Sequence, residues 1–168
     1  MVRAGDVKGT YIEQASGVII DYDEILTVNH IADHEYFAIH YDDTTTFNHC
    51  TLNDYSTDQD AAILTPSNRT VKPVQIGDSD TVKVGDKVYV ISCPDANKNV
   101  VLSGIIIDDG QYKGIYIFEI DTSVVGGGSG GAVFNSNGEL IGILDGISLT
   151  GQSNYFIPIN DIRESLAA

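Results

Sequence analysis

Residues 126–144 of this 168-residue chain have the sequence GGGSGGAVFNSNGELIGIL. The stretch begins with five glycines around Ser129. Two apolar runs follow, 131–134 and 139–144, separated by the turn-forming sequence Asn-Ser-Asn-Gly. Short apolar runs joined by such a sequence are typical of β-hairpins. The stretch therefore predicts a tight, glycine-rich turn that leads into a hairpin.

The same pattern of short apolar runs continues through the rest of the chain. Further runs, bounded by Gly, Asp, Asn or Pro, are found at 16–21, 25–28, 36–41, 61–64, 87–91, 100–107 and 115–120. Asp108-Asp109-Gly110 predicts a turn before the last of these runs. The one predicted helix is the tail 159–166, with Asn160 as its N-cap. Many short strands with a single short helix indicate an all-β sandwich or barrel.

A polar stretch rich in Gly and Asp, 67–86, divides the apolar runs into two groups. We therefore predict a single domain, 1–168, built from two halves that share an interface. The N-terminal barrel comprises 1–66, the inter-barrel connection 67–86, and the C-terminal barrel with the tail helix 87–168.

Composition and charge exclude several classes of protein. The chain carries 9 basic and 24 acidic residues and a formal net charge of −15, which disfavours binding to nucleic acid. No run approaches the roughly 20 apolar residues that a membrane span needs. No apolar segment of the secretory type follows Met1, so we expect a cytoplasmic or virion-associated protein unless a leader has been removed. Cys50 and Cys93 are predicted to be reduced thiols.

The glycines around Ser129 suit an acyl-transfer enzyme. A nucleophilic serine needs a tight turn whose backbone N–H groups converge where a carbonyl oxygen becomes an oxyanion, and glycine allows the backbone angles that such a turn requires. A flexible Gly/Ser linker would have a similar composition. Strands are predicted on both sides of this segment, however, which favours the catalytic interpretation.

A serine hydroxyl also needs a base and a carboxylate that orients the base. Of the four histidines, His30 ends an apolar strand, which would hold its imidazole rigidly. Asp60 opens the apolar run 61–64, and Asp58 is its competitor. We predict His30, Asp60 and Ser129 as the catalytic residues. Their order along the chain is that of the chymotrypsin class.

These residues lie in segments that resemble the protease domain of the HtrA (Deg) serine peptidases. Residues 16–30 resemble the family's histidine block, and 60–64 resemble its Asp-x-Ala-x-Leu block. Residues 121–143 resemble the serine block. Shorter matches are found at 76–86, 102–106 and 156–159. The resemblance implies a chymotrypsin-like double antiparallel β-barrel with a short C-terminal helix, and a trypsin-like serine endopeptidase.

The resemblance also implies the remaining site residues. It implies an oxyanion hole from the backbone N–H groups of Gly127 and Ser129. It places Val124 and the strand Gly146-Ile147-Ser148 at the pocket for the residue before the cleaved bond. No acidic residue stands six before the serine, where Ser123 is found, so we expect cleavage after small or medium aliphatic residues. If Asp121 or Asp145 turned into the pocket, Lys or Arg would be preferred instead.

The chain departs from the family in ways that leave its biological role open. No PDZ domain follows the peptidase segment, and Gly128 stands where Asn or Asp is usual. Two alternatives to a general endopeptidase remain: a dedicated processing protease for a virion or polyprotein, and a non-catalytic protease-like binding module. The expected partner is a polypeptide substrate, and the oligomeric state is left open. No segment has the ligand spacing of a zinc or calcium site, so we predict no metal and no cofactor.

Overall fold

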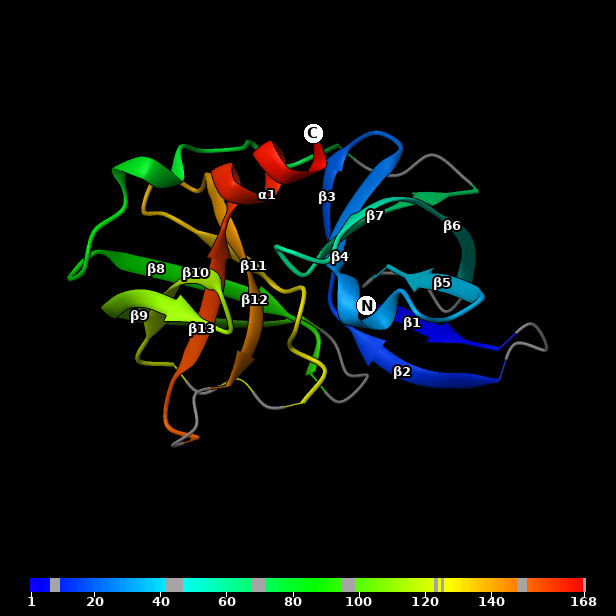
Figure 1. Cartoon of the computed structure of the whole chain (residues 1–168), viewed down its shortest axis with the longest axis horizontal. Coiled ribbons are helices and arrows are strands. Elements are labelled where there is room, and N and C mark those ends of the chain that lie inside the picture. The colour runs from blue at the N-terminus through cyan, green and yellow to red at the C-terminus, as the bar shows by residue number, and fades with distance from the viewer. Residues whose placement is uncertain are drawn as a thin grey trace.

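The computed structural model describes residues 1–6, 10–41, 47–67, 72–94, 99–122, 124, 126–147 and 151–167. Figure 1 shows two β lobes side by side, the N-terminal one in blue and cyan and the C-terminal one in green to orange. A short helix, α1 (Ile159–Leu166), lies along one edge of the pair. The prediction of an all-β, double-barrel fold with a short C-terminal helix is confirmed.

The N-terminal lobe is a seven-stranded sheet with the order β2-β1-β5-β6-β7-β4-β3. Neighbouring strands pair antiparallel throughout. The strands are β1 (Val2–Gly5), β2 (Tyr11–Ala15), β3 (Val18–Asp21), β4 (Glu24–Val28), β5 (Tyr36–His40), β6 (Phe47–Ser56) and β7 (Ala61–Pro66). Strands β4 and β7 pair with each other. Strand β4 ends just before the turn that carries His30, and β7 begins directly after Asp60.

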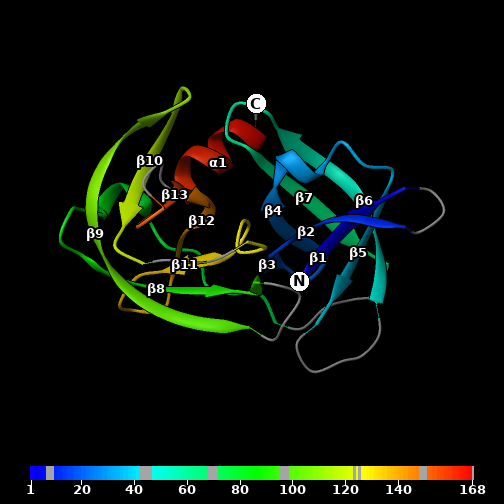
Figure 2. The ribbon, with the colours of Figure 1, turned by 90° about the horizontal axis from the view of Figure 1, so that it is seen from below.

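The C-terminal lobe is a closed six-stranded barrel with the order β10-β13-β12-β11-β8-β9. Figure 2 shows the long strand β9 wrapping around one side of this lobe. The strands are β8 (Lys87–Ser92), β9 (Val100–Tyr112), β10 (Ile115–Ile120), β11 (Ala132–Phe134), β12 (Leu140–Ile147) and β13 (Asn154–Pro158). Closure leaves this barrel without a free sheet edge.

One apolar cluster joins the two lobes. It contains Leu26 and Leu64 of the first lobe together with Leu140, Ile143 and Ile159 of the second, all of them buried. Burial of apolar surface stabilises this contact by about 25 cal/mol per Å². The loops at the junction of the lobes therefore rest on this buried cluster. A site formed by residues of both lobes is held in a fixed geometry by this packing.

Two details of the predicted elements are wrong. Asp108-Asp109-Gly110 does not turn the chain, because β9 continues to Tyr112 and the hairpin turns at Lys113 and Gly114, whose φ angles are 51° and 90°. Asn160 does not cap α1. The N-cap is Pro158, and the Asn160 side chain donates to Asp78 Oδ1 at 2.8 Å. Asn160 therefore ties the helix to the connection between the lobes.

Cys50 and Cys93 are both buried and unbonded to each other, as predicted. In the part of the chain that the structure describes, no helix has the length and apolar character needed to span a membrane.

Candidate active site

His30 is presented by a single 3-10 turn, Asn29–Ile31, which directly follows β4. The side chain of Ile31 is buried beneath the turn. A side chain locked in the core fixes the short turn that carries it, and with it the neighbouring imidazole. The His30 side chain is 47% exposed, so one side of its ring remains open to a ligand.

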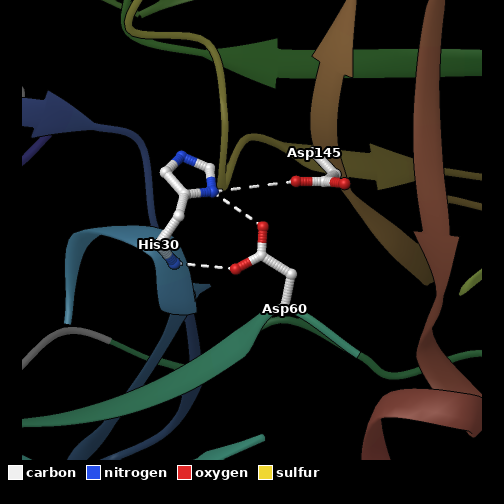
Figure 3. A group of neighbouring side chains, drawn as sticks. All are labelled: His30, Asp60 and Asp145. Carbon is white, nitrogen blue, oxygen red and sulfur yellow. Dashed lines mark hydrogen bonds and ion pairs between the residues drawn. The ribbon is translucent and has the colours of Figure 1, made fainter. Parts of the chain in front are cut away.

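Asp60 holds His30 by two hydrogen bonds (Figure 3). Its Oδ2 lies 2.7 Å from Nδ1 of the imidazole, and its Oδ1 accepts the backbone N–H of His30 at 2.7 Å. The φ angle of Asp60 is 43°, a left-handed conformation that Asp and Asn adopt more readily than most residues. The carboxylate is thus fixed in one orientation, and the imidazole is fixed with it.

Ser129 lies in the glycine-rich turn, and left-handed glycines stand on both sides of it. The φ angles of Gly127 and Gly130 are 83° and 79°. A Cβ on Gly130 would lie 2.2 Å from the carbonyl oxygen of Ser16, so no other residue fits there without a shift of the backbone. The sequence-based expectation of a turn that only glycine can make therefore has a direct physical reason at this position.

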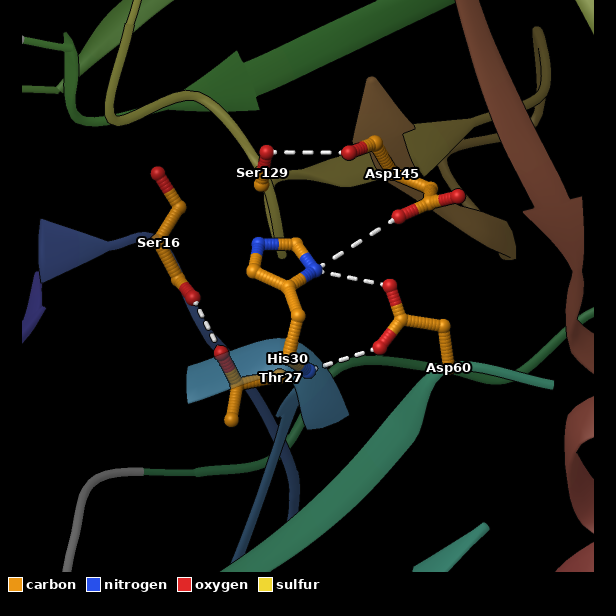
Figure 4. Close-up of polar contacts among 6 residues, drawn as sticks. All are labelled: Ser16, Thr27, His30, Asp60, Ser129 and Asp145. Carbon is orange, nitrogen blue, oxygen red and sulfur yellow. Dashed lines mark hydrogen bonds and ion pairs between the residues drawn. The ribbon is translucent and has the colours of Figure 1, made fainter. Parts of the chain in front are cut away.

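The Ser129 hydroxyl donates to the backbone carbonyl oxygen of Asp145 at 3.0 Å (Figure 4). Within the described residues it forms no hydrogen bond with His30. In enzymes without bound substrate, catalytic hydrogen bonds are often long or misaligned and tighten when the substrate binds. If Ser129 transfers its proton to His30, the hydroxyl has to turn away from the carbonyl oxygen of Asp145.

Backbone N–H groups around Ser129 fall into two sets. The N–H group of Gly130 donates to the carbonyl oxygen of Leu144 at 2.7 Å, and that of Gly131 donates to the carbonyl oxygen of Gly128 at 2.9 Å. The N–H groups of Gly127 and Ser129 donate no hydrogen bond to any described residue. The two donors expected to form the oxyanion hole are thus not consumed by the fold, and the same holds for the N–H groups of Gly126 and Gly128.

Ser16, whose carbonyl contact with Thr27 is drawn in Figure 4, connects this turn to the N-terminal lobe. Its N–H donates to the carbonyl oxygen of Ser129 at 2.7 Å, and its Oγ donates to the carbonyl oxygen of Gly127 at 2.9 Å. The same Oγ accepts the backbone N–H of Cys93 at 2.8 Å, and the Ser16 carbonyl accepts the Thr27 hydroxyl at 2.7 Å. One buried residue therefore fixes two peptide groups of the turn, 127–128 and 129–130. The sequence offered no signal for this role, because Ser16 stands at the start of an ordinary strand pattern.

We expect Ser16→Ala to lower kcat about tenfold and to leave KM within about twofold. Removal of one oxyanion donor costs about 10²–10³ in kcat, and loss of a group that only positions the donor should cost less. The matched control is Ser92→Ala, since the buried Ser92 hydroxyl has no hydrogen-bond partner among the described residues. Steady-state kinetics on a peptide substrate would decide, and equal kcat values for the two variants would contradict the expectation.

Asp145 is a second acidic residue at the site. It was not predicted to lie beside the triad. Its Oδ1 lies 3.8 Å from Nδ1 of His30, and its side chain is 11% exposed. The ligand-type atoms of His30, Asp60 and Asp145 lie within 4.8 Å of one another. We assign no metal ligand among them. Nδ1 of His30 is hydrogen-bonded to Oδ2 of Asp60, and Oδ1 of Asp60 accepts the backbone N–H of His30, so these atoms are already engaged.

The two groups of the His30–Asp60 pair shift each other's ionisation. The hydrogen bond from Asp60 raises the pKa of His30, burial opposes this, and the negative charges of Asp60, Asp145 and Glu13 add to the rise. Burial alone would raise the pKa of Asp60, but the hydrogen bonds from His30 and Asp145 outweigh burial and lower it. Asp60 therefore stays ionised near neutral pH, as a carboxylate that orients a base must.

A small hollow opens beside Ser129, with a cavity volume of about 40 Å³. Its described walls are Val124 and residues 126–129 on one side, Leu144, Gly146 and Ile147 on the other, and Asn154. The predicted pocket residues Val124, Gly146 and Ile147 are thus brought together, whereas Ser148 lies outside the described residues. The Asn154 side chain bridges the walls: its Oδ1 accepts the Val124 N–H at 2.6 Å, and its Nδ2 donates to the Gly146 carbonyl oxygen at 3.2 Å.

Two antiparallel β lobes with a histidine, an aspartate and a glycine-flanked serine at their junction define the class of chymotrypsin-like peptidases. The family of trypsin-like peptidase domains matches residues 15–143, well over half of the chain. The chain belongs to this family. The prediction of a trypsin-like, HtrA-like serine endopeptidase is confirmed at the level of the family.

Curated relatives point the same way. An HtrA-like serine protease of Staphylococcus haemolyticus is 33% identical over 177 residues, which cover 90% of this chain and 27% of that protein. An HtrA-like serine protease of Staphylococcus aureus strain USA300 is 36% identical over 117 residues, which cover 60% of this chain and 15% of that protein. The chain spans less than a third of the length of these relatives.

Solved structures share the fold over nearly the whole chain. The HtrA-type protease AlgW with a decapeptide has a TM-score of 0.82 and 26% sequence identity, over 91% of this chain and 50% of that one. The active form of the Rv3671c protease from M. tuberculosis has a TM-score of 0.87 and 18% identity, over 99% of this chain and 78% of that one. At 18% identity the likeness concerns the fold alone.

Proposed function

We propose that this domain hydrolyses peptide bonds through an acyl-enzyme on Ser129. The observation that carries the proposal is the pair of 2.7 Å contacts from Asp60 to the ring nitrogen and the backbone N–H of His30. A carboxylate on Nδ1 keeps the proton there, which leaves Nε2 unprotonated and able to accept the proton of a serine hydroxyl. A protein without such chemistry has no need to fix one histidine at two points.

The reaction then follows from the groups present. Ser129 Oγ bonds to the substrate carbonyl carbon while its proton passes to His30, and the carbonyl oxygen becomes an oxyanion. The N–H groups of Gly127 and Ser129 stabilise that charge. The C–N bond breaks as His30 returns the proton to the leaving amine. Water, deprotonated by His30, next attacks the ester, and the Ser129 hydroxyl is regenerated.

A polypeptide is the proposed substrate. AlgW, which shares the fold at 26% identity, is seen with a decapeptide, and a second AlgW structure is seen with a tripeptide. An extended peptide suits a site between two β lobes, because strand-like backbone pairing gives affinity while a pocket reads a side chain.

A fluorophosphonate probe tests the catalytic proposal directly. It reacts with a serine only where a base activates the hydroxyl and an oxyanion hole stabilises the adduct. We expect stoichiometric labelling, with the added mass on the peptide that contains Ser129. A non-catalytic binding module would stay unlabelled, and that outcome would remove the proposal.

Cleavage is proposed to follow small or medium aliphatic residues. Among the described residues, no carboxylate lines the hollow beside Ser129. Asp121 is turned elsewhere, with its Oδ1 accepting the Ile105 N–H at 2.6 Å, and Asp145 faces His30. A buried Arg or Lys side chain would find no partner there, which makes its burial costly.

We expect a peptide with Val before the scissile bond to be cleaved at least about tenfold faster, in kcat/KM, than the same peptide with Arg. Two chromogenic peptides that differ only at this residue make the comparison. Asp121→Asn is the control variant, since, of Asp121 and Asp145, Asp121 is the carboxylate that does not face His30. Faster cleavage of the Arg peptide by the native chain, abolished in Asp121→Asn, would show that the pocket is acidic.

A further inference from the structure

Asp145 is the group at this site that the proposed reaction leaves without a task. It stands on β12 at a point where the pairing with β13 shifts register, between Leu144 and Gly146. A β-bulge of this kind re-aims a side chain relative to the regular alternation of the strand. Figure 3 shows the Asp145 side chain directed at His30 and Asp60 from the opposite lobe. One of its carboxyl oxygens lies within 4.8 Å of an oxygen of Asp60.

Two carboxyl groups this close repel each other when both are ionised, and this repulsion favours a proton on one of them. A hydrogen bond between them requires a proton on one of the two. Asp60 accepts two hydrogen bonds from His30, which favour its charged form. The proton therefore resides on Asp145, whose side chain is only 11% exposed.

We propose that Asp145 is a positioning residue, which in its protonated form donates a hydrogen bond to Asp60 and holds that carboxylate against His30. This inference rests on the proposed function, since it concerns the residue that orients the base. It differs from a role in the pocket, because Asp145 is not among the residues that line the hollow beside Ser129.

The surrounding charges agree with a protonated Asp145. Burial, the hydrogen bond to Asp60 and the charge of Asp60 raise the pKa of Asp145 to about 7, against opposing effects of His30 and Lys113. Tyr155 also interacts with the charge of Asp145, which raises the pKa of the Tyr155 hydroxyl together with burial. Glu13 acts on His30 by charge alone. Asp145 is thus neutral on the acidic side of pH 7 and becomes an anion beside the imidazole above it.

The sign of the pH effect follows. An anion next to His30 stabilises the imidazolium, so in the native chain His30 keeps its proton to a higher pH than it would beside a neutral group. Asp145→Asn is neutral at every pH, and its amide can still donate to Asp60. We expect the midpoint of His30 deprotonation to fall by about half a unit or more in this variant. The acidic limb of the pH–activity profile should move down with it.

The test is an NMR titration of the His30 ring nitrogens in ¹⁵N-labelled full chain between pH 5 and 9, for the native residue, Asp145→Asn and Glu13→Gln. All samples carry Ser129→Ala to prevent self-cleavage, and this change leaves the Asp145 carboxyl group untouched. We expect two inflections for the native cluster and one, at lower pH, for Asp145→Asn. Glu13→Gln, the charge-only control, should keep both inflections with a smaller shift.

Kinetic measurements on variants that keep the native Ser129 complete the test. Asp145→Asn should keep kcat at pH 6, where the native Asp145 carries its proton, within about threefold of the native value, and Asp145→Ala, which cannot donate to Asp60, should lose about tenfold at that pH. An unchanged His30 titration in Asp145→Asn, a shift equal to that of Glu13→Gln, or identical kcat values for the Asn and Ala variants would overturn the proposal. If the native chain shows no hydrolysis at all, the proposed function fails, and the titration still decides the role of Asp145.

Discussion

Ser129→Ala is expected to lower peptide hydrolysis by on the order of 10⁴-fold or more while leaving the fold intact. No covalent intermediate can form without the hydroxyl, and loss of one triad member in a serine protease removes most of the catalysis of all three. Among the described residues, the Ser129 side chain makes one hydrogen bond that the substitution removes, to the carbonyl oxygen of Asp145. The backbone contact from Ser16 N–H to the Ser129 carbonyl oxygen does not depend on the side chain.

The measurement is cleavage of casein together with thermal unfolding of both proteins. Ser136→Ala is the matched control, since it removes an exposed hydroxyl that makes a single long contact to the Lys87 carbonyl oxygen. The control should keep full activity, and Ser129→Ala should keep the melting temperature within a few degrees of native. Cleavage of casein by Ser129→Ala at near the native rate would mean that the nucleophile is another residue.

Much of this architecture could be predicted from sequence because the apolar runs are short and sharply bounded. Chain turns such as the one between β3 and β4 fall where polar residues interrupt the runs. Four strands were not predicted: β1, β2, β6 and β13. Residues Tyr11 to Glu13 of β2 are all exposed, so the strand has no apolar face to signal it, and its pairing with β1 is decided by the rest of the lobe.

The triad residues could be predicted because each stands at a recognisable boundary. Ser129 lies among glycines, His30 ends an apolar run, and Asp60 opens one. Asp145 could not be predicted in its present role. Residues 140–144 of β12 are all buried, so the usual alternation does not show which way the next side chain points. The register shift after Leu144 then sets its direction, and no local pattern in the sequence marks that shift.

Ser16 and Asn154 illustrate the same limit. Each is a polar residue beside a strand whose side chain satisfies backbone groups distant in sequence, Gly127 for Ser16 and Val124 for Asn154. Buried polar groups require such partners, but the identity of the partner depends on how the two ends of the chain meet. Sequence patterns report local structure, and these contacts are purely tertiary.

Asp60→Asn is expected to lower kcat/KM by about 10⁴-fold at pH 7, whereas Asp58→Asn should change it less than about twofold. Asn tolerates the left-handed conformation of residue 60, whose φ is 43°, so the backbone stays in place. The side chain then has one acceptor oxygen where the carboxylate has two. If that oxygen accepts the His30 backbone N–H, the amide NH₂ faces Nδ1 of the ring.

An NH₂ group facing Nδ1 forces the imidazole into the tautomer that carries its proton on Nε2, and such a ring cannot accept the proton of Ser129. Asp145 cannot replace the missing carboxylate, because its Oδ1 lies 3.8 Å from Nδ1, beyond hydrogen-bond distance. Exposed Asp58 serves as the matched control, with the same chemical change two residues away. Rates on one peptide substrate for both variants decide the matter. Equal losses would show that Asp60 does not orient the base, and a loss confined to Asp60→Asn is the result that its two hydrogen bonds to His30 require.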